Sequence, residues 1–263
     1  MPFSLEHKCL FVHIPRPGGS SFRKALGVKE PTEDTPAQDL NGDFTLQPLT
    51  EKDLPTFVQL HHLCMKQIQM IGVLEPSLLN ESFKCAFVRN PWDKVASKYF
   101  HNYQHHSDSF EDFIVKVEKI VAFVNENFVF DIESAFYKKY SDLIISTLTE
   151  SMHNKTLNPW RHKAIWIDPH FFPQHFFIYD ELGNILIDFV GRFENYNKDA
   201  HHILSHLGAS RLYQTRAGVL KPLPIPHLNY STRLDYREMY NLKTKDIVYN
   251  LFKKDIQTFD YTF

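Results

Sequence analysis

The sequence contains few cysteines. Three of its 263 residues are cysteine (Cys9, Cys64 and Cys85), and no two of them form a CxxC pair. A disulfide framework or a thiolate zinc site needs more cysteines, or cysteines at closer spacing. Because two of the three lie inside apolar runs, we expect reduced thiols in the core rather than a disulfide or a metal site.

Long apolar runs and an excess of one charge are also missing. No run reaches the roughly 18 apolar residues of a membrane span, and the first strand-like run begins at about Lys8, which leaves no room for a signal peptide. We therefore expect a cytoplasmic protein without a membrane span. The 29 Lys and Arg against 31 Asp and Glu give a net charge of -2. No global positive field attracts nucleic acid or an anionic membrane, so any anion site must be local.

The composition is that of an ordinary globular protein, and the order of the predicted strands and helices indicates the α/β class. Hydrophobic residues make up 43% of the chain, enough for a core that needs neither disulfides nor metal. Two apolar runs, residues 9–14 and 85–88, predict strands buried on both faces in a parallel sheet. Apolar spacing predicts helices over about residues 22–26, 60–73, 91–103, 110–145, 195–208 and 233–257, and a hairpin with arms 176–179 and 185–190. Without repeats or a clear linker, we predict a single domain, residues 1–263, with a central parallel β-sheet flanked by helices.

A glycine-rich segment connects the first buried strand to the first helix. It has the sequence HIPRPGGSS (residues 13–21). Such a turn points backbone N–H groups and the positive end of a helix at one place, where phosphate or sulfate binds. The segment is not a Walker A loop, because no Lys-Ser/Thr pair follows the second glycine. A Gly-Gly turn with a purely structural role is the alternative.

A second candidate anion site follows the second buried strand. Arg89 stands at the carboxyl end of this strand, and Ser97 lies two turns into the next helix. Carboxyl ends of parallel strands converge on one crevice, where ligands of open α/β folds bind. Arg89 and Ser97 could bind a second phosphate there. The alternatives are a surface ion pair for Arg89 and an ordinary helix position for Ser97.

Taken together, these segments resemble the carbohydrate-type sulfotransferases, which use 3′-phosphoadenosine 5′-phosphosulfate (PAPS). The resemblance is carried, in the family's order, by residues 11–22, 83–99, 169–174, 187–199 and 252–263. It implies a P-loop-like fold and transfer of a sulfuryl group from PAPS, with PAP as product and no required metal. The acceptor it implies is a hydroxyl, most typically of a carbohydrate.

The resemblance also implies which residues bind PAPS. The 5′-phosphosulfate loop corresponds to Arg16, Pro17, Gly18, Gly19, Ser20 and Ser21. Arg89 and Ser97 correspond to the residues that bind the 3′-phosphate. Asn229, Tyr230 and Ser231 belong to a late loop that closes over the nucleotide.

The loop departs from the family pattern at two positions. The family's loop usually has Lys-Thr before the two glycines, whereas this chain has Arg16-Pro17. Arginine also places positive charge near the departing phosphate, but as a wider planar fork. Proline removes one N–H and one hydroxyl from the loop. We expect PAPS binding to survive the change and turnover to be more sensitive to it.

Sulfuryl transfer to a hydroxyl requires a base, and histidine suits this role because it titrates near neutral pH. His61 and His62 are predicted to open the helix over residues 60–73, and His62 matches the histidine of the family segment. We therefore take His62 as the base, Arg16 as the catalytic cation, and His170 as the reserve base or a group that positions the acceptor.

Other histidines and other functions give weaker hypotheses. His202 and His206 have the i, i+4 spacing of zinc ligands, but no cysteine or carboxylate completes a set with them or with His201, so a solvated helix face is favoured. A catalytically impaired PAPS- or glycan-binding protein of the same fold is the alternative to an enzyme. A nucleotide kinase is less favoured, because it would need a loop lysine.

Overall fold

The computed structural model describes residues 3–28, 47–48, 56–58, 62–72, 74–102, 108–132, 134–152, 165–166, 169–210, 212–214, 220–222, 224–225 and 235–263. The chain divides into two compact units. The first contains Met1–Thr45, Leu60–Arg89 and Ile178–Tyr230, and the second contains Leu46–Gln59, Asn90–Phe177 and Ser231–Phe263. The single domain over residues 1–263 stays a prediction.

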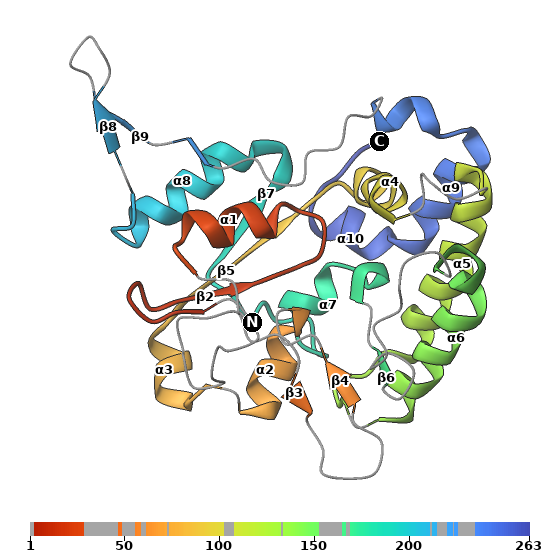
Figure 1. The fold of residues 1–263 in the computed structure, drawn as a ribbon, viewed down its shortest axis with the longest axis horizontal. Coiled ribbons are helices and arrows are strands. Elements are labelled where there is room, and N and C mark those ends of the chain that lie inside the picture. Colours follow the sequence, from red (N-terminus) through yellow and green to blue (C-terminus); the bar gives the residue numbers. More distant parts are fainter. Residues whose placement is uncertain are drawn as a thin grey trace. The chain divides into compact units, whose positions relative to one another are not determined.

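The first unit is built on a four-stranded sheet with the order β1-β2-β5-β7 (Figure 1). Its strands are β1 (Phe3–Ser4), β2 (Cys9–Val12), β5 (Phe83–Val88) and β7 (Phe189–Arg192). β1 is antiparallel to β2, whereas β2 pairs with β5, and β5 with β7, in parallel. The mixed α/β architecture with a mostly parallel sheet is therefore confirmed. The carboxyl ends of β2 and β5, where residues 13–21 and Arg89 begin, share one edge of this sheet.

Two helices, α1 (Gly19–Ala25) and α8 (Tyr196–His206), cover one face of the sheet (Figure 1). The Phe22 ring of α1 lies 4.9 Å from the ring of Phe11 and 5.2 Å from that of Phe87, centroid to centroid. Ile203 of α8 belongs to the same buried cluster. All four residues of β2 are buried, as expected of a strand covered on both faces.

The remaining elements of the first unit are short. They are α2 (Met65–Ile71), α3 (Pro76–Glu81), η4 (Phe193–Asn195), β8 (Leu212–Gln214) and β9 (Leu220–Pro222). The predicted helix over 60–73 begins later than expected, because Cys64 is extended (ψ 151°) and its N–H donates to the Gln67 side chain, 2.9 Å away. The prediction that His62 opens this helix is therefore wrong: His62 precedes it. His61 lies outside the described residues.

The second unit is mostly helical. Its main helices are α4 (Pro91–Asn102), α5 (Phe110–Asn127), α6 (Ala135–Met152), α9 (Leu242–Leu251) and α10 (Lys253–Thr258). Shorter elements are η3 (Pro169–Phe171), α7 (His175–Ile178), η5 (Tyr236–Met239), and a sheet of β3 (Gln47–Pro48), β4 (Thr56–Val58) and β6 (Ile165–Trp166). Asn90 caps α4 as predicted, accepting from Trp92 N–H at 3.1 Å. None of the helices in the described ranges is both long and apolar enough to cross a membrane.

The predicted hairpin around residue 183 forms only in part. Asp180 accepts from the N–H groups of Leu182 and Asn184, and Gly183 has φ 84°. The only pairing of the two arms in this stretch, residues 176–190, is an isolated bridge between Tyr179 and Ile185. The first arm is instead the helix α7, so the prediction of a strand there is wrong.

Candidate functional site

The glycine-rich loop is held tightly by aromatic side chains. Gly18 has φ 85°, a conformation that favours glycine, and a Cβ there would lie 2.8 Å from the Tyr196 ring. A Cβ on Gly19 would lie 2.0 Å from the ring of His13. Both glycines are thus required by packing, so their presence alone does not establish an anion site.

The contacts of Arg89 give stronger evidence for an anion site at the same sheet edge. Arg89 is 6% exposed, and its Nη1 donates to the carbonyl oxygen of Arg16 at 3.0 Å. Its guanidinium carbon lies 4.0 Å from the centroid of the Phe193 ring, within the range of a cation–π contact. The Arg16 carbonyl and the Phe193 ring thus both position the Arg89 guanidinium. The structure therefore brings the Arg89 side chain to the backbone of Arg16.

The backbone of Arg16 adopts an uncommon conformation. Its φ is 82°. For any residue with a Cβ, this backbone conformation costs roughly 1 kcal/mol or more of free energy. The hydrogen bond from Arg89 to the Arg16 carbonyl helps hold this conformation. Such outliers cluster at binding and catalytic sites, so Arg16 is a functional candidate on conformation as well as on charge.

Tyr196 supports the loop and was not singled out from the sequence. Its hydroxyl donates to the carbonyl oxygen of Gly18 at 2.8 Å. Burial raises the pKa of Tyr196 well above its ordinary value, although hydrogen bonds from Ser21 and from the Phe22 N–H oppose the shift. Tyr196 therefore stays protonated and keeps donating. The signal available was its position inside the matched segment, residues 187–199.

The ring of His13 lies between His62 and the glycine-rich loop. The rings of His13 and His62 are 4.6 Å apart, centroid to centroid, and the two residues are 7% and 8% exposed. Nδ1 of His62 is 2.8 Å from the carbonyl oxygen of His13. Because a carbonyl oxygen only accepts, this hydrogen bond places the proton on Nδ1 and leaves the lone pair of a neutral imidazole on Nε2.

The hydroxyls of the loop differ in exposure. Ser20 is half-buried, whereas Ser21 is 3% exposed and its side chain hydrogen-bonds Tyr196. Pro17 is buried beside Arg16. Of the two loop hydroxyls, that of Ser20 is therefore the more accessible to a ligand.

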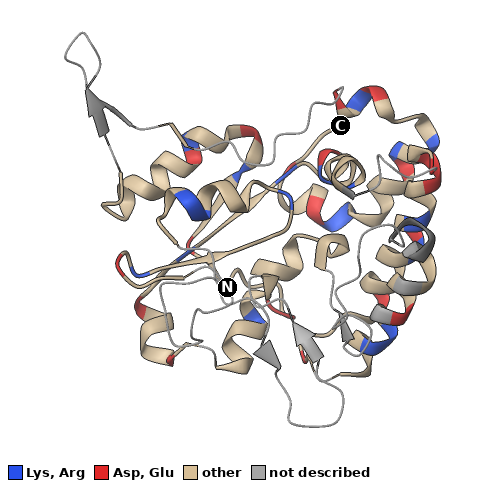
Figure 2. Ribbon diagram, in the orientation of Figure 1, with Lys and Arg blue, Asp and Glu red and all other residues tan. Residues whose placement is uncertain are grey.

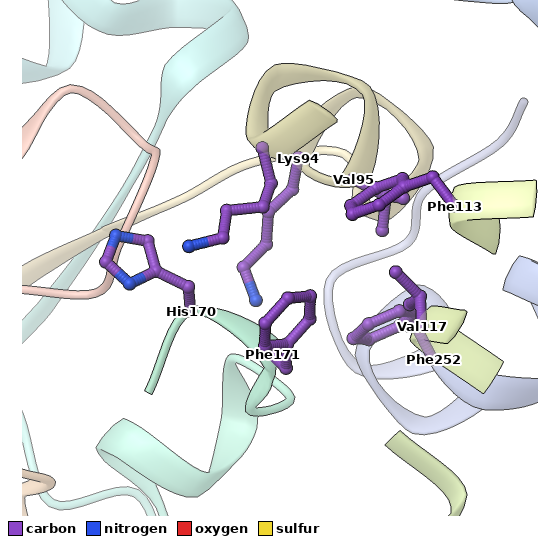
Figure 3. A pocket seen from close by; sticks show the side chains of 8 residues that line it. Lys94, Val95, Phe113, Val117, His170, Phe171 and Phe252 are labelled. Atoms are coloured by element: carbon purple, nitrogen blue, oxygen red, sulfur yellow. The ribbon is translucent and has the colours of Figure 1, made fainter. Parts of the chain in front are cut away.

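Two further predicted residues belong to the second unit. Ser97 is 5% exposed on α4. His170, on η3, lines a hollow together with Lys94 and Lys98 of α4 (Figure 3). Asn229, Tyr230 and Ser231, the predicted late loop, lie outside the described residues.

The cysteines and the helix histidines do not add a site. The three cysteines are buried and free, and burial raises the pKa of the Cys64 and Cys85 thiols, so neither supplies a thiolate at neutral pH. His202 and His206 of α8 lie against the rings of Phe189 and Phe83. Among the described residues, no three His, Cys, Asp or Glu side chains are grouped as a metal site would require.

Charge is otherwise distributed evenly. Among the described residues, segments of Lys and Arg and segments of Asp and Glu are both scattered over the two units (Figure 2). This distribution agrees with the net charge of -2, and it makes the paired arginines a local feature rather than part of a broad basic surface.

Comparison with known proteins gives one match. The model of the sulfotransferase family matches residues 3–262. No curated protein and no solved structure matches the chain significantly.

Proposed function

Since this chain belongs to the sulfotransferase family, we propose that it transfers the sulfuryl group of PAPS to a hydroxyl of a carbohydrate. The family supports sulfuryl transfer by an enzyme. The donor and the class of acceptor are the proposal, and both follow from the resemblance of residues 11–22 and 83–99 to the carbohydrate-type members.

One observation carries the proposal: the buried Arg89 side chain and the ring pair of His13 and His62 both lie against the glycine-rich loop that carries Arg16. Arg89 is bound to the Arg16 carbonyl at 3.0 Å, and His62 lies one ring from Gly19 through His13. Two guanidinium groups fit a doubly phosphorylated ligand, because they form short charge-assisted hydrogen bonds with phosphate oxygens. The residues present therefore fit PAPS.

Each residue would have a defined role. PAPS supplies an activated sulfuryl group attached to a phosphate that leaves when the group is transferred. Arg16 would stabilise the negative charge that grows on the leaving phosphate, and Ser20 would donate a hydrogen bond beside it. Arg89 would bind the 3′-phosphate.

His62 would take the proton from the acceptor hydroxyl. Its Nδ1–H donates to the His13 carbonyl, so Nε2 carries the lone pair that accepts the proton. As Nε2 gains this proton, the imidazole becomes positively charged, and the His13 carbonyl continues to accept from Nδ1. The hydrogen bond thus fixes the orientation of the ring before and after proton transfer.

The direct test is transfer of radiolabelled sulfate from PAPS to a panel of glycans and small alcohols. Label should appear on at least one carbohydrate hydroxyl, and Arg16→Ala should transfer it about 10²-fold more slowly. PAP binding without transfer to any member of a broad panel would support the alternative, a binding protein of the same fold. Absence of PAP binding would contradict the proposed function and the PAPS-binding form of the alternative.

A further inference from the structure

Two aromatic side chains from one short segment contact both parts of the donor site in the first unit. Phe193 opens η4 and Tyr196 opens α8, directly after β7. The guanidinium carbon of Arg89 lies over the Phe193 ring, 4.0 Å from its centroid. The Tyr196 hydroxyl donates to the carbonyl oxygen of Gly18 at 2.8 Å. Neighbouring residues of one segment therefore contact Arg89 and the glycine-rich loop.

The two rings also contact each other and the loop. Their centroids are 5.9 Å apart, and a Cβ on Gly18 would lie 2.8 Å from the Tyr196 ring and 3.3 Å from the Phe193 ring. Arg89 itself donates to the carbonyl oxygen of Arg16, two residues before Gly18, at 3.0 Å. The contacts thus form a closed set that runs from the loop through Tyr196 and Phe193 to Arg89 and back to the loop.

The segment that carries the two rings is fixed to the sheet. The N–H of Arg192 donates to the Asp199 carboxylate at 2.7 Å, which ties the end of β7 to α8. The Tyr196 ring packs against the ring of Phe87 in β5, 4.9 Å away, and Phe87 is 1% exposed. Closely packed side chains transmit a displacement instead of absorbing it. A shift of the loop at Gly18 is therefore expected to reach Phe193.

The Phe193 ring limits the orientations of the Arg89 side chain. A guanidinium is planar, and its N–H groups point outward in that plane. A ring against one face leaves those edges to make hydrogen bonds and restricts rotation of the side chain. Restricting a side chain before a ligand binds lowers the entropy cost of binding. Phe193 is thus placed to act on a phosphate through Arg89.

We propose that Phe193 and Tyr196 are positioning residues that couple the glycine-rich loop to Arg89, so that the loop conformation sets how tightly Arg89 binds the 3′-phosphate. The inference rests on the proposed function, which assigns the 3′-phosphate to Arg89. Phe193 acts on Arg89 directly, and Tyr196 acts on it through Gly18 and Phe193. The two ends of the donor would then be recognised together and not independently.

Calorimetry with PAP and with adenosine 5′-monophosphate (AMP), which differs from PAP only in lacking the 3′-phosphate, measures the coupling. The ratio of the AMP Kd to the PAP Kd gives the preference for the 3′-phosphate. Phe193→Leu keeps apolar bulk without a ring and should lower this preference about fivefold, the effect of a partly desolvated cation–π contact. Phe193→Tyr keeps the ring and should retain the preference. An unchanged preference in Phe193→Leu would overturn the proposal.

Tyr196→Phe gives the sharper test, because it keeps the ring and removes only the hydroxyl. This hydroxyl makes its hydrogen bonds with Gly18, Ser21 and the N–H of Phe22. If the loop and Arg89 are coupled, losing it should lower the preference for the 3′-phosphate about threefold, part of the effect of one hydrogen bond. A hydroxyl that merely supports the loop would weaken AMP and PAP by the same factor. An unchanged preference would therefore overturn the coupling.

Two matched variants of the first unit control for general loosening. Phe189→Leu removes a half-buried ring of β7 that lies against His202, 5.0 Å between centroids. Tyr179→Phe removes the hydroxyl of a half-buried tyrosine. Both should leave the preference unchanged, and a fall as large as that in the Phe193 and Tyr196 variants would overturn the proposal.

A double-mutant cycle shows whether the effect passes through Arg89. In an Arg89→Ala background, Phe193→Leu should change the preference no further, because the ring then has no guanidinium to position. The same fivefold fall in both backgrounds would overturn the proposal.

The wild type separates this inference from the proposed function. If it binds PAP no more tightly than AMP, the assignment of the 3′-phosphate to Arg89 is wrong, and the coupling is wrong with it. If the wild type prefers PAP and both Phe193→Leu and Tyr196→Phe keep that preference, the coupling alone is wrong and the donor assignment stands.

Discussion

The two units surround their buried charged groups differently. In the first, the Arg89 guanidinium is held by the Arg16 carbonyl and the Phe193 ring. In the second, the Asp255 carboxylate is fully buried and accepts three hydrogen bonds from Gln174 and His175. Under the proposed function, Arg16 and Arg89 would serve binding and catalysis, whereas the hydrogen bonds of Asp255 would serve stability.

The largest effect is expected at His62 in the first unit. His62→Ala should lower kcat about 10²–10⁴-fold, the usual contribution of a positioned general base, and should still bind PAP. His202→Ala, an exposed histidine of the same unit, is the control for steady-state kinetics and calorimetry. If His170→Ala abolishes turnover while His62→Ala retains it, the base has been placed in the wrong unit.

The next largest effect is expected at Asp255, on stability. Asp255→Asn should lower the free energy of unfolding by about 3 kcal/mol at pH 7, because it leaves the buried partners without their counter-charge. Urea unfolding of both proteins measures the loss. A change below about 0.5 kcal/mol, as for an ordinary surface position, would remove the contrast between the units.

The pH dependence of this stability has a definite sign. Burial alone would raise the pKa of Asp255, but the hydrogen bond and charge of His175 and the charge of Lys94 outweigh it, so the pKa lies below its ordinary 3.8. A lowered folded-state pKa stabilises the protein above the unfolded pKa, and this contribution is lost as pH falls through the folded-state value. The difference between wild type and Asp255→Asn should therefore shrink at acidic pH. A difference that is independent of pH would show that the charge is not its source.

Turnover should also fall when Arg16 is replaced, but by less than when His62 is replaced. Arg16→Ala should lower kcat about 10²-fold, as loss of one donor to a transition-state anion does, with a smaller change in PAP affinity. Arg16→Lys, which restores the family residue, should retain or raise kcat. Weaker PAPS binding with unchanged kcat would instead show that Arg16 stabilises the bound donor and the transition state equally.

The smallest effect concerns the backbone of the same residue. Since φ of Arg16 is 82°, Arg16→Gly should be about 1 kcal/mol more stable than Arg16→Ala, because only glycine adopts this conformation without a Cβ penalty. Thermal or urea unfolding of the two variants compares them directly. Equal stability would show that the loop relaxes and stores no strain at this position.

Strands and helices that depend on residues close together in the sequence were predictable from it. The continuous apolar runs predicted β2 and β5 as buried parallel strands, and Asn90-Pro91 predicted the start of α4. The position of Arg89 after β5 followed from the same pattern. These signals are local, because they depend on residues close together in sequence.

Features that depend on distant residues were not predictable. The strand expected before Asp180 is the helix α7, because the Asp255 carboxylate, 80 residues away, caps its first N–H groups. The contact of Tyr196 with Gly18 spans 178 residues, and that of His62 with His13 spans 49. No spacing within a single segment indicates such pairs.

The most direct test of the arginine site compares two nucleotides by thermal unfolding. PAP at a hundredfold excess over its Kd should stabilise the protein by about 2.7 kcal/mol, whereas adenosine 5′-phosphosulfate, which lacks the 3′-phosphate, should stabilise it much less. Arg89→Ala should erase this difference while retaining a folded unit. Equal stabilisation of the wild type by both nucleotides would contradict the assignment of Arg89 to the 3′-phosphate and, with it, the account of the first unit.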